Sequence, residues 1–421
     1  MRLFNTLSQQ IEPLDIRDQP VSLYVCGITP YDTTHLGHAW INVVYDCLVR
    51  YLRWRGATVR YVQNVTDIDD DILRKARETG TTWDELGTRE TAKYLADLRA
   101  LHVQMPDYYV RASAETPAMI SLIETLVAKG YAYVRDGWVY YSVRQDPDFG
   151  RLADAGGYVG YENWLATAND RGNFPDDPRK LDPLDFVLWQ AQQPGEPAWP
   201  SPWGPGRPGW HIECSAMSIK YLGEQLTIHG GGSDLVFPHH TCEIAQSEHA
   251  TGTAPFVQTW MHCAMVELDG VKMSKSLGNL ILVRDLLAEY SPDAVRILLL
   301  RHHYREPWSY TAEDMRASAE LAGRLACAQR RAVDGAAGEA ATRGPVIQLR
   351  DPDGESAGRQ ARLEFIAALE DDFQTPRALE ALRRLAGRIC ESASSASVGA
   401  LAAQVATLTE LAAILGLSLS Q

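Results

Sequence analysis

Apolar side chains near the N-terminus form first a strand-like run and then a helical pattern. Residues 21–26 (VSLYVC) are a short, continuous apolar run that predicts a buried strand ending before Gly27. Residues 39–55 carry apolar positions at helical spacing, and Gly56 is placed to end that helix. Residues 58–65 predict the next strand. The order strand, helix, strand predicts a βαβ unit and therefore a parallel sheet.

The pattern changes further along the chain. Residues 155–207 are rich in Gly, Pro, Asp and Trp, which indicates an inserted connective region. Strand-like runs return at 225–229 and 258–268, so we expect the sheet to resume there. Beyond residue 285 the apolar spacing is helical, with a loop of small and charged residues predicted at 331–359.

These patterns predict an α/β protein in three parts, which suits a chain of 421 residues. We expect a Rossmann-like parallel sheet domain from residues 1–110 and 208–284. A connective insertion would occupy residues 111–207, and a C-terminal helical bundle would occupy residues 285–421.

Composition narrows the setting in which the protein works. The chain is 45% hydrophobic and 22% charged, which is typical of a soluble globular protein. We expect no signal peptide, because the start MRLFNTLSQQ lacks an apolar segment, and no apolar run reaches the length of a membrane span. Seven scattered cysteines do not form a disulfide framework. These features favour a cytoplasmic protein without a membrane partner, and we expect a monomer.

The net charge bears on nucleic-acid binding. A formal charge of −14 argues against a broad basic surface, although a local basic groove is compatible with that sum. The charge therefore disfavours a protein whose whole task is to hold nucleic acid.

The first motif with chemical meaning is His35-Leu36-Gly37-His38, which follows the first predicted strand and opens a helix. A helix N-terminus offers unpaired N–H groups and a positive dipole to phosphates. His35 and His38 can both point at phosphate oxygens, and Gly37 lets a nucleotide approach the backbone. Taken alone, the motif is equally compatible with a structural role.

The second motif is Lys272-Met273-Ser274-Lys275-Ser276, in a loop before a helical region. Alone it is an ordinary solvated loop, but its position after the second set of strands, far downstream of His35-Leu36-Gly37-His38, favours a shared nucleotide site. The chain has no Walker A and no G-x-G-x-x-G motif, which argues against a P-loop or dinucleotide site. The two motifs together resemble the signature pair of class I aminoacyl-tRNA synthetases.

That resemblance implies adenylation, in which a carboxylate attacks the α-phosphate of ATP and pyrophosphate leaves. Such a step needs positioning and charge neutralisation rather than a proton-transferring side chain. His35 and His38 would hold the phosphates, and Lys272 and Lys275 would balance charge on pyrophosphate with Mg²⁺. The run from Gly230 to Asp234 would bring backbone against the adenosine, or would simply form a tight turn.

Four further residues carry ligand chemistry. Cys26 ends the first predicted strand, Cys214 lies in the segment WHIECS, and His239 and Glu243 are spaced to share a helical face. Two thiolates, an imidazole and a carboxylate suit a tetrahedral Zn²⁺ site. Because sequence alone cannot show that they meet, buried packing is the alternative role for both cysteines.

Surrounding segments are similar to the cysteine-activating members of the class I family, densely over residues 1–320. This resemblance implies one Zn²⁺ per chain, held by Cys26, Cys214, His239 and Glu243, which selects cysteine because Zn²⁺ prefers a thiolate to a hydroxyl. It also implies a set of residues around the cysteinyl-adenylate, with Asp234 as partner of the substrate ammonium: Cys26, Gly27, Thr29, Asn64, Thr66, Trp210, Gly232, Ser233, Asp234 and Val266.

Two members of this group differ in the acceptor of the cysteine. Residues 26–32, 63–66 and 170–173 resemble the mycothiol-pathway ligase, which joins cysteine to the amine of glucosaminyl-inositol. Residues 239–246 and 184–189 resemble cysteinyl-tRNA synthetase, which uses tRNA(Cys). The C-terminal region offers little room for an anticodon-reading domain. We therefore favour ATP, L-cysteine and glucosaminyl-inositol as partners, with tRNA(Cys) as the alternative acceptor.

A different class of function stays open at this stage. A catalytically silent paralogue could bind RNA or protein, although every catalytic motif is intact.

The second step of the reaction, transfer of the cysteine, also needs a base if an amine is the acceptor, because only a neutral amine attacks. The sequence assigns no residue to that role.

Overall fold

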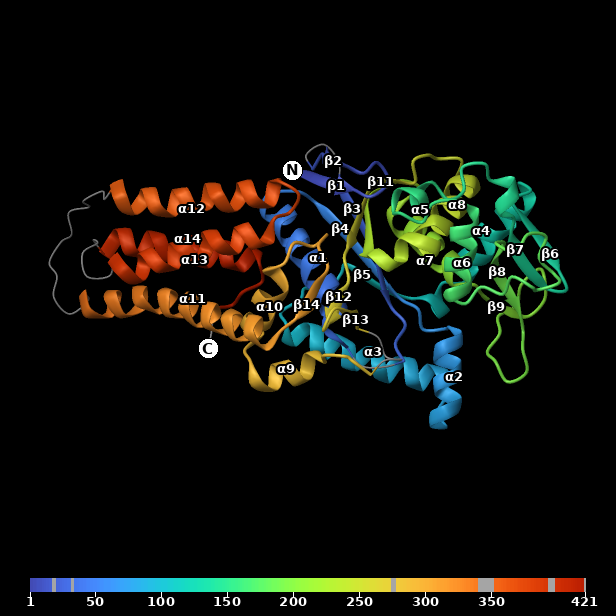
Figure 1. Ribbon diagram of the computed structural model, residues 1–421, viewed down its shortest axis with the longest axis horizontal. Coiled ribbons are helices and arrows are strands. Elements are labelled where there is room, and N and C mark those ends of the chain that lie inside the picture. Colours follow the sequence, from blue (N-terminus) through green and yellow to red (C-terminus); the bar gives the residue numbers. More distant parts are fainter. Residues whose placement is uncertain (17–19, 32–33, 274–277, 340–351, 393–397, 420–421) are drawn as a thin grey trace.

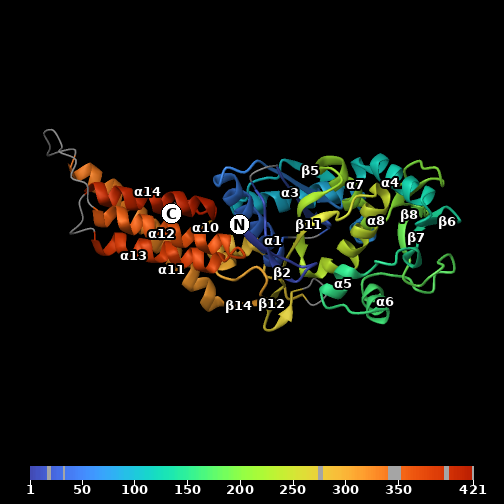
Figure 2. The same ribbon diagram turned by 90° about the horizontal axis from the view of Figure 1, so that it is seen from above.

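The computed structural model describes residues 1–421 except for 17–19, 32–33, 274–277, 340–351, 393–397 and 420–421. A central sheet lies between a long helical bundle at one end and the connective insertion at the other (Figures 1 and 2). None of the described helices combines the length and hydropathy that crossing a bilayer requires.

The central sheet has five strands in the order β11-β10-β3-β4-β5, all paired in parallel. Their bounds are β3 Val21–Ile28, β4 Val59–Val65, β5 Tyr108–Arg111, β10 Leu226–Gly232 and β11 Val257–Cys263. The predicted Rossmann-like α/β fold is confirmed. The chain runs outward from β3 in both directions, so the carboxyl ends of β3 and β10 form the topological switch point where such sheets bind ligands.

Strand β3 is longer than the sequence indicated. A register shift between Val25 and Ile28 lets pairing with β4 continue beyond Gly27, so Cys26 lies inside the strand rather than at its end. Leu23 and Val25 belong to the core that includes helix α1 (Leu36–Trp54). The alternate residue Cys26 belongs to the core that includes helix α7 (Trp210–Leu222). The two-residue period of the strand thereby directs Cys26 toward α7.

Helix α1 begins three residues before the apolar spacing indicated. His35 is its N-cap, and the ring Nδ1 of His35 accepts a hydrogen bond from the Gly37 N–H at 3.1 Å. A histidine at this position escapes the usual cap signals, because Ser, Thr, Asp and Asn dominate them. After β4 the chain continues into α2 (Asp70–Thr79) and α3 (Trp83–Ala100).

The connective insertion has its own antiparallel sheet, in the order β6-β7-β8-β9. Its elements are α4 Thr116–Ala128, β6 Ala132–Arg135, β7 Trp138–Tyr141, α5 Arg151–Ala155, α6 Tyr161–Asp170, β8 Phe186–Ala191 and β9 Gly206–Pro208. The stretch 155–207, which the sequence indicated as an inserted connective region, thus contains helix α6 and strands β8 and β9. The three-part division of the chain stays a prediction.

Shorter elements connect these layers. They are β1 Arg2–Asn5, β2 Gln10–Pro13, β12 Val266–Leu268, β13 Val271–Lys272, β14 Trp308–Tyr310, α8 Thr241–Thr251, α9 Val283–Glu289 and α10 Pro292–Leu300. Four short helical turns are η1 Ala112–Ala114, η2 Val143–Gln145, η3 Ser233–Leu235 and η4 Val236–His240. Segments η3 and η4 lead from β10 directly into α8.

Four helices form the C-terminal bundle (Figure 1): α11 Ala312–Glu339, α12 Pro352–Glu370, α13 Thr375–Ser392 and α14 Val398–Ile414. The loop predicted at 331–359 is wrong at both ends, because α11 runs through to Glu339 and α12 starts at Pro352. Arg296 of α10 docks the bundle onto the sheet domain. Its buried guanidinium donates to the Leu415 carbonyl at 2.9 Å and to Asp46 of α1 at 2.6 Å.

Candidate active site

A cavity of about 1150 Å³ opens at the carboxyl ends of β3 and β10 and extends along the insertion. Its lining combines backbone from both strand ends with side chains from α1 and α7. The sequence-predicted residues that line it are Cys26, Gly27, Thr29, His35, His38, Trp210, Gly232, Asp234 and Val266. Most of the predicted substrate site is therefore gathered around one space, at the switch point of the sheet.

Asn64, Thr66 and Ser233 do not line this cavity. Asn64 is buried behind the wall, where its Oδ1 accepts a hydrogen bond from the Gly27 N–H at 2.9 Å. Thr66 is also buried, and its hydroxyl donates to Glu213 at 2.9 Å. Ser233 is half-buried at the start of η3. Asn64 and Thr66 thus support the wall of the cavity, and the predicted contacts of these three residues with the substrate stay predictions.

Gly27 is required by a close approach of two strands. A Cβ at this position would lie 1.6 Å from the backbone oxygen of Asn64. Gly232, at the end of β10, is similarly constrained, because a Cβ there would lie 2.5 Å from the Asp234 carboxylate. Both glycines bring backbone to the cavity where a larger residue would displace its wall.

Replacing Gly27 with alanine is expected to lower the free energy of unfolding by about 1–3 kcal/mol, because the Cβ must push β3 away from Asn64. Cysteine-dependent ATP–pyrophosphate exchange should fall as well, because β3 carries Cys26. Gly87→Ala is the matched control, since a Cβ there meets its nearest atom at an ordinary 3.8 Å inside α3. Urea unfolding of both variants checks this, and equal stability of the two would contradict it.

The N-terminus of α1 supplies the anion-binding part of the cavity. The rings of His35 and His38 are stacked, with centroids 3.7 Å apart, and both residues line the cavity. The positive end of the α1 dipole lies at this same end of the helix. Lys272 lies in β13, and Lys275 lies outside the described residues. Between them, Met273 is buried and lines the cavity, so the chain passes the cavity wall at this point.

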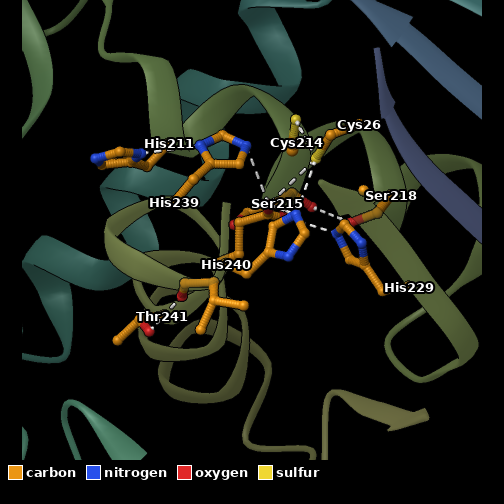
Figure 3. A network of polar contacts seen from close by, with 12 residues as sticks. Cys26, His211, Cys214, Ser215, Ser218, His229, His239, His240 and Thr241 are labelled. Atoms are coloured by element: carbon orange, nitrogen blue, oxygen red, sulfur yellow. Dashed lines mark hydrogen bonds and ion pairs between the residues drawn. The ribbon is translucent and has the colours of Figure 1, made fainter. Parts of the chain in front are cut away.

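The four predicted metal ligands meet in one buried cluster. Three of them, Cys26, Cys214 and His239, are labelled in Figure 3. Cys26 Sγ lies 3.7 Å from Cys214 Sγ and 3.7 Å from Glu243 Oε1. His239 Nε2 lies 3.2 Å from the same Glu243 oxygen. The four come from three distant elements, which are β3, α7 and the η4–α8 segment.

These distances fit tetrahedral Zn²⁺. Bonds of about 2.3 Å to sulfur and about 2.0–2.1 Å to nitrogen or oxygen separate ligands by about 3.8 Å for two sulfurs, about 3.6 Å for sulfur and oxygen, and about 3.3 Å for nitrogen and oxygen. Burial raises the pKa of the Cys26 thiol well above its usual value, with neighbouring Cys214 as a further cause. A cation offsets that cost, because metal ligation favours the thiolate.

A second set of candidate ligands overlaps the first. Cys26, His229, His240 and Glu243 also lie close together. The 2.9 Å between His229 Nε2 and Glu243 Oε2 is a hydrogen-bond distance, and the 3.9 Å between His240 Nε2 and Glu243 Oε1 is too long for two ligands of one zinc. The first set therefore fits a metal better, and His229 orients the Glu243 carboxylate.

Sequence reasoning missed a shell of histidines around these ligands (Figure 3). His211 Nδ1 lies 2.9 Å from His239 Nδ1, and burial lowers the pKa of His211 to about 3, so its ring is neutral. His240 lies 3.3 Å from the Cys26 sulfur and 2.8 Å from His262. Such partners fix the orientation of metal ligands. Two of them, His229 and His262, lie on the adjacent strands β10 and β11. Their positions in two predicted strands were the only sequence signal that could have indicated them.

Trp210 lines the cavity beside the cluster. Its ring stacks on His239 with centroids 4.3 Å apart and planes at 23°, while 37% of the residue stays exposed. Asp234 lines the cavity beyond it.

Two family models match the chain. The model described as "tRNA synthetases class I (C) catalytic domain" matches residues 12–320, and the model described as "DALR domain" matches residues 364–420. Among curated proteins, the "Cysteine--tRNA ligase" of Methylococcus capsulatus is 45% identical over 99% of this chain and 85% of its own length. That of Gloeothece citriformis is 49% identical over 76% of this chain and 65% of its own length.

Solved structures show the same fold at low sequence identity. A methionyl-tRNA synthetase of Mycobacterium tuberculosis in complex with methionyl-adenylate has a TM-score of 0.67 at 18% identity, covering 95% of this chain and 90% of that chain. A leucyl enzyme from Agrobacterium radiobacter, titled as a LeuRS–tRNA–LeuAMS ternary complex, has a TM-score of 0.67 at 13% identity, covering 97% and 87%.

Proposed function

The chain belongs to the class I tRNA synthetase family whose catalytic-domain model spans residues 12–320, and we propose that it activates L-cysteine with ATP and transfers it to tRNA. Members of this family are ATP-dependent ligases that release AMP. The observation that carries the proposal is the buried cluster of Cys26, Cys214, His239 and Glu243 beside the cavity. A metal held by this cluster would bind the thiolate of the substrate and so select cysteine.

Activation follows from the layout of the cavity. The substrate carboxylate attacks the α-phosphate of ATP, which enters as its Mg²⁺ complex, and pyrophosphate leaves. His35, His38 and the first turn of α1 line the cavity, where they would face the phosphates and stabilise their charge. Lys272 and Lys275 would neutralise the departing pyrophosphate. No side chain needs to move a proton in this step.

Cysteine selection follows from the four ligands. When bound, Zn²⁺ supplies a Lewis-acid position that takes a thiolate far more readily than a hydroxyl. Cys26, Cys214 and His239 would hold the ion, and Glu243 would complete its ligands or leave room for the substrate sulfur. His229 keeps Glu243 oriented through its 2.9 Å contact. Asp234 would pair with the substrate ammonium, and Trp210 would cover the site.

The matches favour tRNA over the glucosaminyl-inositol that we expected from the sequence. The relatives aligned along nearly the whole chain carry the name cysteine--tRNA ligase. The expectation rested partly on a C-terminal region without room for a further domain, and residues 364–420 of that region match a DALR domain model. The expectations of a cytoplasmic location and a monomer stay predictions.

The acceptor can be tested with both candidates in parallel. Purified protein would receive ATP and cysteine, with either tRNA(Cys) or glucosaminyl-inositol, and AMP release and product would be followed. We expect cysteinyl-tRNA and no turnover of the amino sugar. Consumption of glucosaminyl-inositol without charging of tRNA would contradict the proposal for the acceptor but leave cysteine activation standing.

A further inference from the structure

The segment between β10 and α8 carries two residues of the cysteine site. Asp234 lies in η3, and His239 lies in η4. The segment is not a regular helix, because Phe237 has extended backbone angles, with φ −138° and ψ 136°. A break of this kind leaves carbonyl groups without the partners that a continuous helix provides. Buried carbonyls need other donors, so the position of this segment depends on its neighbours.

One arginine of the insertion supplies those donors. Arg171 follows α6, and its Nη1 donates hydrogen bonds to the backbone carbonyls of both Asp234 and Phe237. Its Nη2 lies 3.3 Å from the Tyr158 hydroxyl, and the guanidinium lies over the Tyr158 ring at 5.6 Å. Tyr158 in turn packs on Phe237, with ring centroids 6.0 Å apart. Arg171 and Tyr158 therefore both bind the irregular segment between β10 and α8.

The insertion packs tightly against this segment at a second point, Gly156. A Cβ at Gly156 would lie 2.4 Å from Val236 Cγ1. The chain after Arg171 then turns along the cavity, where residues 172–180 line its outer part. Asp234 and Phe237 line the cavity as well. Arg171 thus joins the outer cavity wall to the wall of the cysteine site.

We propose that Arg171 is a positioning residue that holds Asp234 and His239 in register for the substrate cysteine. The inference rests on the proposed function, because it assigns a purpose to the site in which cysteine is bound. Charge-assisted hydrogen bonds to two carbonyls three residues apart fix both position and direction of the segment. Arginine suits the task better than lysine, because its planar guanidinium is long and presents several donors.

Steady-state ATP–pyrophosphate exchange of Arg171→Ala tests this. We expect the KM for cysteine to rise about 10-fold or more, because small displacements of binding groups have large effects, while kcat changes by less than about 3-fold. The KM for ATP should be unchanged, since Arg171 contacts the amino-acid wall. Arg171→Lys should recover part of the cysteine KM.

The matched control is Arg144→Ala in the same insertion. Arg144 pairs with Asp182 at 2.5 Å and lies over the Tyr161 ring, away from the segment 234–240. The Arg144 side chain is exposed, and the buried Asp182 keeps its hydrogen bond from the Tyr161 hydroxyl at 2.6 Å, so the cysteine KM of this variant should stay within about 2-fold of wild type. Hydrogen exchange gives a readout without catalysis: the amides of residues 235–237 and 239–240 should exchange faster in Arg171→Ala, with the rest of the sheet domain unchanged.

The outcomes separate the two claims. Absence of cysteine-dependent ATP–pyrophosphate exchange in the wild-type protein would reject the proposed function. The hydrogen-exchange measurement would still test whether Arg171 holds the segment in place. Equal cysteine KM and equal amide exchange in Arg171→Ala and Arg144→Ala would overturn the inference. A matching rise in the KM for ATP, or faster exchange throughout the domain, would overturn it too, because the role would then be general stability.

Discussion

Replacing Cys214 with alanine is expected to lower the affinity for zinc by at least about 100-fold, since changes even to residues that only support metal ligands cost up to that factor. Cys214 is buried on α7, and its sulfur lies 3.7 Å from that of Cys26. Cys26, His239 and Glu243 would then be left to bind with one thiolate fewer. Cysteine-dependent activation should fall with the metal.

Elemental analysis after dialysis against a chelator measures this directly. Cys47→Ala is the control, because Cys47 is a buried cysteine of α1 outside the cluster. It should keep its zinc, and Cys26→Ala should behave like Cys214→Ala. Full zinc content in both cluster variants would show that these cysteines only pack, as free buried cysteines commonly do.

Lys275→Ala is expected to lower the rate of cysteine activation by about 10²–10³-fold, which is the usual cost of one lost charge-stabilising group. Negative charge on pyrophosphate develops in the transition state, so kcat should fall and the KM for cysteine should change little. Lys275 lies outside the described residues, and its assignment rests on the motif and on nearby Met273, which lines the cavity.

ATP–pyrophosphate exchange over a range of cysteine concentrations separates the two parameters. Lys75→Ala is a suitable control, because Lys75 is exposed on α2 and faces Glu78 at 3.5 Å. If Lys275→Ala raised only the KM for cysteine, the lysine would serve substrate binding and its assigned role would be wrong.

Local patterns predicted the parts of the fold that depend on neighbouring residues. The apolar run at β3, the helical spacing of α1 and the runs at β4, β10 and β11 each reflect burial of one element, and burial repeats with the period of that element. The loop expected at 331–359 was wrong at both ends, because Gly and charged residues were taken as helix breaks, although the alanines among them favour helix.

The sequence could not predict how deeply a residue near the cavity is buried, or which residues from separate strands come into contact. Asn64 and Thr66 were expected at the substrate, yet both lie behind the cavity wall, because the residue type does not tell which side of a strand end faces the cavity. The histidines around the metal ligands, such as His229 and His262, come from separate strands. Only the parallel pairing of β10 and β11 brings them together. The four candidate ligands could be proposed from the sequence because the surrounding segments resemble the cysteine-activating members of the family, and the structure brings them into one cluster.

The most direct test of metal-based cysteine selection is ATP–pyrophosphate exchange by the zinc-loaded wild-type protein with cysteine and with serine. The two amino acids differ only in sulfur against oxygen, so the comparison isolates the ligand preference of the cluster. We predict exchange with cysteine, and exchange with serine lower by about 10⁴-fold or more, as for other sites built around one polar group. Exchange with serine within about 10-fold of that with cysteine would contradict the account.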